Sequence, residues 1–161
     1  MVVVIMGVSG SGKSTIGRAL ARAVDGRFHD ADDFHPAKNV RKMKSGQPLT
    51  EADREPWLEA LRVAVESWLV QPGVDVLACS ALKDSHRRQL GVDGVRVRLV
   101  YLHGSAGLIR ARMEAREDGL LSPDMLDSQL AELEPPEDAL TLDIEEPVET
   151  LVQQIRSAFN L

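Results

Sequence analysis

VVVIMGVSGSGKSTIGRAL, residues 2–20, predicts more of the architecture than any other part of the chain. Residues 2–6 are apolar at every position, which is typical of a central strand buried on both faces of a sheet. Residues 7–14 match the phosphate-binding pattern G-x-x-x-x-G-K-[ST], and a helical pattern follows them. Since this pattern requires a strand before it and a helix after it, the stretch predicts a nucleotide-binding α/β domain.

The glycines of this loop allow its backbone to curl, so that successive N–H groups point inward at phosphate oxygens. The helix that follows adds the positive end of its dipole. Lys13 is expected to reach the β- and γ-phosphates, and Ser14 to offer its hydroxyl to a magnesium ion.

Apolar runs and helical patterns alternate along the rest of the chain. Further strands are expected at residues 27–28, 74–79, 97–102 and 140–144. Helices are expected at residues 13–24, 53–70, 82–90, 105–117, 122–133 and 147–159, with Pro56 in the first turn of the second. This alternation favours a parallel sheet covered by helices on both faces, with ligands at the carboxyl ends of the strands.

Length and composition narrow the classes of protein. A chain of 161 residues predicts one domain, residues 1–161. A net charge of −6 gives no basic footprint for nucleic acid. Cys79 is the single cysteine, which excludes an intramolecular disulfide and favours a reducing compartment. The apolar start is too short for a signal peptide or a membrane span, so a cytoplasmic location without membrane contact is expected.

Two classes of nucleotide-binding protein lack support in the sequence. The D-x-x-G and [NT]-K-x-D elements of GTPase switches do not occur. The run at 74–80 ends in Cys79 and Ser80, where a large ATPase would place an Asp-Glu pair. A compact kinase for a small molecule is the remaining class.

FHDADDFHP, residues 28–36, places acids at the end of the expected second strand. Asp30 is expected to hold magnesium through water. Asp32 is expected to take the proton from an attacking hydroxyl, or to orient that hydroxyl. The alternative for both is a helix cap or a solvated turn. Asp33 is expected to face away or to cap the next turn.

Several motifs together resemble the gluconokinase family, essentially from end to end: GVSGSGKST (7–15), FHDADDFHP (28–36), DREPWL (53–58), CSALK (79–83), VYLHG (100–104), MLDSQ (125–129) and LDIEEP (142–147). The resemblance implies transfer of the γ-phosphate of ATP to the 6-hydroxyl of D-gluconate. It also implies a P-loop kinase fold like that of shikimate kinase: a three-layer α/β/α sandwich with a five-stranded parallel sheet and a helical lid at about 112–130. Shikimate kinase itself is disfavoured because CSALK replaces its glycine-rich turn.

The resemblance also implies roles for individual residues. Lys13, Asp32 and Arg116 would be catalytic, while Ser14 and Asp30 would hold Mg²⁺. ATP would be bound by the phosphate loop and two lid arginines: Gly7, Val8, Ser9, Gly10, Ser11, Gly12, Lys13, Ser14, Thr15, Arg112 and Arg116. The sugar acid would be bound by Asp32, His35, Arg54, Lys83 and Arg87.

Each role has a structural alternative. Arg54 could instead be an exposed arginine in the first turn of a helix, paired with Glu51 or Glu55. Lys83 and Arg87 could be exposed surface charges, and His35 could be a structural cap. The lid arginines could form ordinary helix-surface pairs, Arg112 with Glu114 and Arg116 with Glu117.

The sequence departs from the family pattern at two places. Ala31 stands where glycine is usual, and Gly119 and Leu120 replace a His-Phe pair in the lid. The second departure leaves open a kinase for a different sugar acid or polyol, and a nucleotide-binding regulator without catalysis is a further alternative. The resemblance implies a homodimer. The methionines at 43, 113 and 125 and the two tryptophans are expected in the core.

Overall fold

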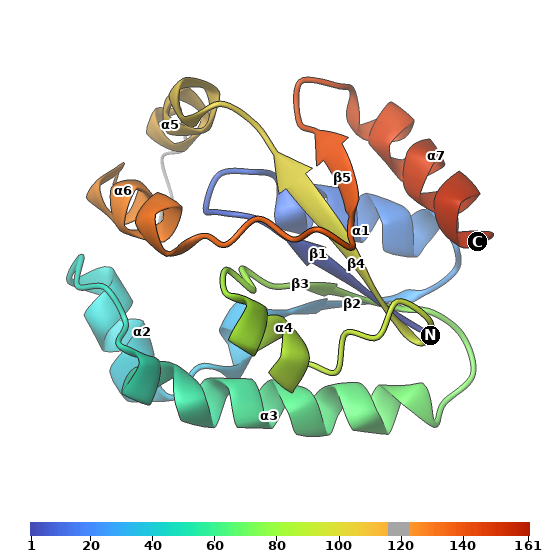
Figure 1. Ribbon diagram of the computed structural model, residues 1–161, viewed down its shortest axis with the longest axis horizontal. Coiled ribbons are helices and arrows are strands. Elements are labelled where there is room, and N and C mark those ends of the chain that lie inside the picture. The colour runs from blue at the N-terminus through green and yellow to red at the C-terminus, as the bar shows by residue number, and fades with distance from the viewer. Residues whose placement is uncertain (116–122) are drawn as a thin grey trace.

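The computed structural model describes residues 1–115 and 123–161 and contains a five-stranded parallel sheet. The strand order across the sheet is β2-β3-β1-β4-β5 (Figure 1). The bounds are β1 Val2–Met6, β2 Arg27–Asp30, β3 Asp75–Ala78, β4 Val97–His103 and β5 Leu140–Asp143. The expected α/β class and five-stranded parallel sheet are confirmed.

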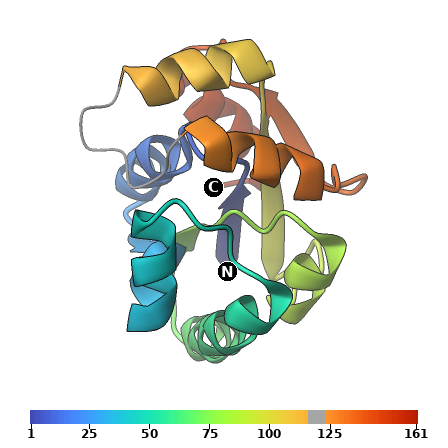
Figure 2. The same ribbon diagram turned by 90° about the vertical axis from the view of Figure 1, so that its left-hand side faces the viewer.

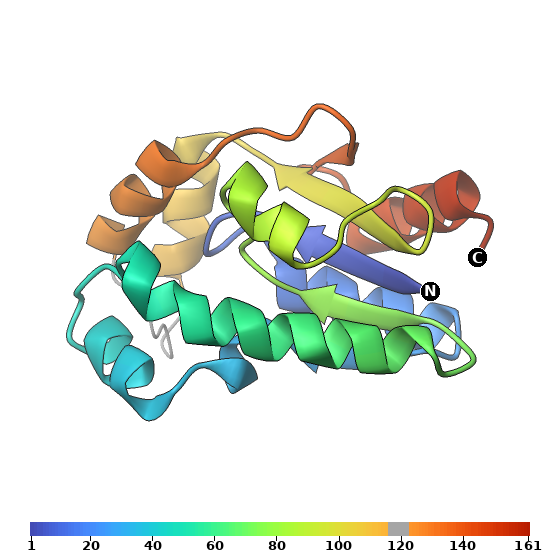
Figure 3. The same cartoon turned by 60° about the horizontal axis from the view of Figure 1, so that its bottom comes forward.

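Helices cover both faces of the sheet and form the outer two of three layers (Figure 1). One face carries α1 (Lys13–Ala23) and α7 (Val148–Phe159), and the other carries α3 (Glu51–Leu69) and α4 (Asp84–Gln89). Figure 3 shows α3 lying along the sheet. The remaining helices gather around the carboxyl ends of the strands, as Figure 2 shows: α2 (Ala37–Lys44), α5 (Ala106–Glu114) and α6 (Pro123–Glu132).

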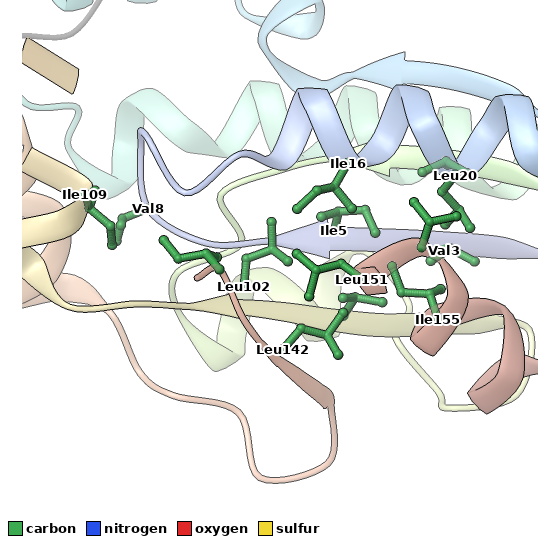
Figure 4. Packing of buried hydrophobic residues seen from close by; sticks show 14 of the residues in the cluster. Val3, Ile5, Val8, Ile16, Leu20, Leu102, Ile109, Leu142, Leu151 and Ile155 are labelled. Carbon is green, nitrogen blue, oxygen red and sulfur yellow. The ribbon is translucent and has the colours of Figure 1, made fainter. Parts of the chain in front are cut away.

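The side chains of β1 alternate between two apolar clusters, one on each face of the sheet. Val3 and Ile5 pack with α1 and α7, where Ile16 and Leu151 are also buried (Figure 4). Val2, Val4 and Met6 join the cluster under α3. Burying one such side chain contributes about 1.5–3 kcal/mol, so the strand that precedes the phosphate loop is held rigidly from both sides.

The structure corrects three details of the expected elements. Helix α3 begins at Glu51, because Thr50 and Asp53 form a capping box, so Pro56 lies in its second turn. Strand β2 extends beyond 27–28 to Asp30 through pairing with β3. Helix α2 and a short 3₁₀ turn at 31–34 were not expected, because α2 has only eight residues, most of them polar, and the turn has only four.

Within the described parts of the chain, no helix is both long and apolar enough to span a bilayer.

Candidate active site

The phosphate loop follows β1 and ends at the N-terminus of α1. Gly10 has a φ of +80°, and a Cβ there would lie 2.6 Å from Cγ of Met113. A Cβ on Gly7 would lie 2.6 Å from Oγ of Ser11. The loop therefore needs glycine at both positions for space, and at Gly10 also for conformation. Nζ of Lys13 donates to the carbonyl oxygen of Val8 at 3.0 Å, across the concave side of the loop.

Ser14 and Asp30 meet at the carboxyl edge of the sheet. The Ser14 hydroxyl donates to Oδ2 of Asp30 at 3.1 Å, and Oδ1 of Asp30 accepts from the Asp32 backbone N–H at 3.0 Å. Within residues 1–115 and 123–161 no group of three or more His, Cys, Asp or Glu is placed to hold a metal. One hydroxyl and one carboxylate beside a phosphate loop nevertheless fit Mg²⁺, which takes most of its ligands from phosphates and water.

Asp32 projects from the 3₁₀ turn into a cavity that residues of the phosphate loop also line. The pKa of its carboxyl lies above the ordinary value, first because the cavity walls restrict hydration and second because Asp30 is also negative. The positive charge of Lys13 opposes this rise. About 64% of the Asp32 side chain is still exposed, so the carboxylate remains open to an incoming hydroxyl. Its position and raised basicity suit a proton acceptor.

His35 follows Asp32 by one turn, with Nε2 4.0 Å from Oδ1 of that carboxylate. Its ring stacks on Trp57 with centroids 4.4 Å apart, and Trp57 in turn donates to the Ala31 carbonyl at 2.7 Å. Burial, followed by the positive charge of Arg54, lowers the pKa of His35 to about 4. The imidazole is therefore neutral at physiological pH.

Arg54 lies on the first turns of α3 and is 9% exposed, in contrast to the alternative of an exposed arginine. Its NH1 donates to Glu51 at 2.8 Å, as that alternative proposed, but its NH2 donates to Glu132 of α6 at 2.6 Å. Lys83 also donates to Glu51, at 3.0 Å. Arg54 and Lys83, which were expected to bind the sugar acid, thus already pair with carboxylates of the protein itself.

Two of the other expected cations, Arg87 and Arg112, do not line the cavity that contains Arg54. The Arg87 guanidinium donates to the carbonyls of Ala81 and Leu82 and borders a second hollow beside α4. Arg112 donates to the carbonyl of Ile144 at 2.7 Å and does not pair with Glu114. The structure thus does not bring either arginine to the phosphate loop. Arg116, Gly119 and Leu120 lie outside the described residues.

A cavity of about 410 Å³ joins the phosphate loop to the acidic turn. Nine of the expected site residues line it: Ser9, Gly10, Gly12, Lys13, Ser14, Asp30, Asp32, His35 and Arg54. Residues that were not expected also line it: Met43, Pro48, Leu49, Trp57, Ala78, Cys79, Ser80, Leu82, Met113, Met125, Ser128 and Gln129. Met113, Met125 and Trp57 are buried, as expected, and also border the site, whereas Met43 is only partly buried and belongs to neither apolar cluster.

Gln129 is the most informative of the unexpected residues. Its Oε1 accepts from the backbone N–H of Ser9 at 2.7 Å, and its Nε2 donates to the Ser9 hydroxyl at 3.3 Å. Helix α6 is therefore joined directly to the phosphate loop. The motif at 125–129 contained this residue, but no local pattern indicates a partner 120 positions away.

Comparison with known proteins agrees with this geometry. Residues 9–154 match the shikimate kinase family. The chain is 42% identical to the gluconokinase of Gluconobacter oxydans over 84% of this chain and 76% of that one. It is 38% identical to the thermoresistant gluconokinase of Escherichia coli over 92% and 87% of the two chains. The crystal structure of a gluconokinase from Sinorhizobium meliloti superimposes with a TM-score of 0.84 at 37% identity, covering 98% of this chain and 90% of that one.

Proposed function

The chain belongs to the gluconokinase family, and we propose that it transfers the γ-phosphate of ATP to the 6-hydroxyl of D-gluconate. The observation that carries this proposal is that Lys13, Asp32 and Arg54 line one cavity. A phosphate-binding cation, a carboxylate that accepts a proton and a buried guanidinium for an acid are the groups that this reaction requires.

In the proposed reaction, the 6-hydroxyl gives its proton to the Asp32 carboxylate. Its oxygen then forms a bond to the γ-phosphorus, while the bond from that phosphorus to the β–γ bridging oxygen breaks and ADP departs. Lys13 and the loop N–H groups stabilise the negative charge on the phosphate oxygens. Arg54, which lines the same cavity, holds the substrate carboxylate. Lys83 lies nearby, since it donates to the same Glu51 carboxylate as Arg54.

Ser14 and Asp30 would hold Mg²⁺ together with the phosphates of ATP. When bound, the ion would neutralise part of the negative charge on the phosphate oxygens. The Ser14–Asp30 hydrogen bond supports this assignment, because it already brings the two oxygen ligands to one point. Substituting Asp30 by Asn should raise the Mg²⁺ concentration at half-maximal rate more than it changes the affinity for ATP.

The test is ADP release in the presence of ATP, Mg²⁺ and D-gluconate, against a control without gluconate. Gluconate-dependent turnover, with a phosphate ester at C6 by ³¹P and ¹³C NMR, is the expected result. A faster rate on another sugar acid would identify that acid, and not gluconate, as the substrate. ATP binding without transfer to any acid would overturn the assignment as a kinase.

The assembly and the location of the protein are part of the same proposal. The family resemblance supports a homodimer, and the single cysteine favours a reducing compartment such as the cytoplasm, with the chain acting as a single domain. Sedimentation equilibrium tests the first point, since a mass of one chain at micromolar concentration would contradict it. Fractionation of the source cells tests the second.

A further inference from the structure

Asn39 is buried completely and does not itself line the cavity, but it contacts His35, which does. Its Nδ2 donates to the backbone carbonyl of Asp53 at 2.7 Å and lies 3.2 Å from Nδ1 of His35. A carbonyl oxygen can accept a hydrogen bond but cannot donate one. The nitrogen of the amide must therefore face Asp53, because the opposite orientation would place two oxygens against each other.

This orientation decides which nitrogen of His35 carries the proton. One Nδ2 proton of Asn39 goes to the Asp53 carbonyl, and the other points at Nδ1 of His35. Nδ1 is therefore an acceptor, so a neutral ring carries its proton on Nε2. The stack on Trp57, with an interplanar angle of 10°, fixes the plane of the ring.

The protonated edge of the ring faces Asp32. The 4.0 Å between Nε2 of His35 and Oδ1 of Asp32 is too long for a direct hydrogen bond. One hydroxyl oxygen fits between them, at roughly 2.8 Å from each atom. If that oxygen accepts from Nε2–H, its own proton must point elsewhere, and the Asp32 carboxylate is the acceptor at hand.

We propose that Asn39 is a positioning residue that holds His35 in its Nε2–H tautomer, and that His35 donates to the acceptor hydroxyl so that the hydroxyl proton points at Asp32. This inference rests on the proposed function, since it assigns the hydroxyl to the sugar acid. A neutral donor serves this purpose better than an imidazolium, which would lower the basicity of Asp32 and withdraw charge from the attacking oxygen.

The first experiment reads the tautomer without reference to activity. In ¹⁵N-labelled protein, long-range ¹H–¹⁵N correlation spectra should show His35 protonated at Nε2, with the resonances assigned through His35→Gln. In Asn39→Asp, the new carboxylate should accept from Nδ1 and move the proton to that nitrogen. A wild-type ring protonated at Nδ1 would overturn the proposal, whether or not gluconate is the substrate.

The second experiment compares two substitutions of His35 in the gluconate reaction. His35→Gln keeps an N–H donor near the position of Nε2, whereas His35→Phe keeps the stack on Trp57 and removes the donor. We expect kcat to be about tenfold lower in His35→Phe than in His35→Gln, as befits one lost hydrogen bond. His103→Gln, outside the cavity, is the control for a histidine change and should leave kcat unaltered.

A loss of kcat in His35→Phe no greater than that in His35→Gln would show that the N–H donor does not contribute, and would overturn the proposal. Asn39→Ala should lower kcat with little change in the Kd for ATP, because the phosphate loop is untouched. Should the Asn39 variants fail to fold, the wild-type spectrum and the two His35 variants still decide the matter. A wild-type protein inactive on every sugar acid would instead remove the proposed function and leave the tautomer result standing.

Discussion

The phosphate half and the acceptor half of the cavity are built in opposite ways. The phosphate loop is continuous in sequence, follows a fully buried strand and takes its shape from backbone dihedrals. The acceptor half combines the 3₁₀ turn, α3 and α6, and its charged groups are already paired with one another: Arg54 with Glu51 and Glu132, and Lys83 with Glu51.

This contrast has a physical consequence for substitutions. In the phosphate half the groups expected to bind phosphate are main-chain N–H groups, so substitutions should act through the shape and strain of the backbone. In the acceptor half the groups expected to bind the sugar acid are side chains that already pair with carboxylates of the protein. Substitutions there should change how strongly those carboxylates compete with the substrate carboxylate for the cations. In the proposed reaction the proton goes to Asp32, whose carboxylate is close to both Lys13 and His35, at the junction of the two halves.

The largest effect is expected at that junction. Asp32→Asn should lower kcat by about 10²–10⁴-fold, the usual contribution of a positioned proton acceptor, with the Kd for ATP almost unchanged. Single-turnover kinetics and calorimetric titration with ATP measure the two quantities. Asp33→Asn is the matched control, since Asp33 is exposed and absent from the lining of the cavity. A turnover close to the wild-type value would remove Asp32 from the role of base.

The next largest effect tests whether substitutions in the phosphate half act through backbone shape and strain. Gly10→Ala should lower the free energy of unfolding by about 1–2 kcal/mol, because φ is +80° there, and should also weaken ATP binding as Met113 is displaced. Gly107→Ala is the control: its Cβ meets nothing within 4 Å, and helix α5 should gain roughly 0.5–1 kcal/mol. Thermal unfolding compares the two, and equal destabilisation would contradict the argument from conformation.

A smaller effect tests competition in the acceptor half. Glu132→Gln removes one of the two negative charges on Arg54, so the KM for gluconate should fall by about three- to tenfold with kcat unchanged. Asp127→Asn is the control on the same helix as Glu132: it breaks the exposed pair between Asp127 of α6 and Arg110 of α5 and should leave KM as it is. A higher KM in Glu132→Gln would mean that Glu132 holds Arg54 in position for the substrate.

The smallest effect concerns stability at low pH. Burial by itself raises the pKa of the Glu51 carboxyl, but hydrogen bonds from Lys83, His86 and Arg54 lower it to about 2. Because the folded pKa lies below the ordinary value of 4.5, the contribution is present above pH 4.5 and is lost as pH falls towards 2. Chemical denaturation of wild type and Glu51→Gln should therefore converge in stability over that interval; parallel curves would contradict the prediction. The effect is small because Glu51 is about half exposed.

Residues 2–14, read alone, were enough to predict the strand, the phosphate loop and the helix after it, because each is specified by local hydrophobicity and backbone conformation. The acids at 30 and 32 could be placed at the same edge for a related reason, since parallel strands end together. Lys13, Ser14, Asp30 and Asp32 consequently do line one cavity.

The tertiary structure alone decided the partners of the long polar side chains. Gln129 meets Ser9, Glu132 meets Arg54, and Arg87 turns away to the carbonyls of Ala81 and Leu82. An arginine or glutamine has many rotamers and can reach any of several groups, so its partner depends on which elements the fold brings within hydrogen-bonding distance. Local sequence specifies the backbone of the phosphate loop; only the packing of distant helices specifies which side chains line the rest of the cavity.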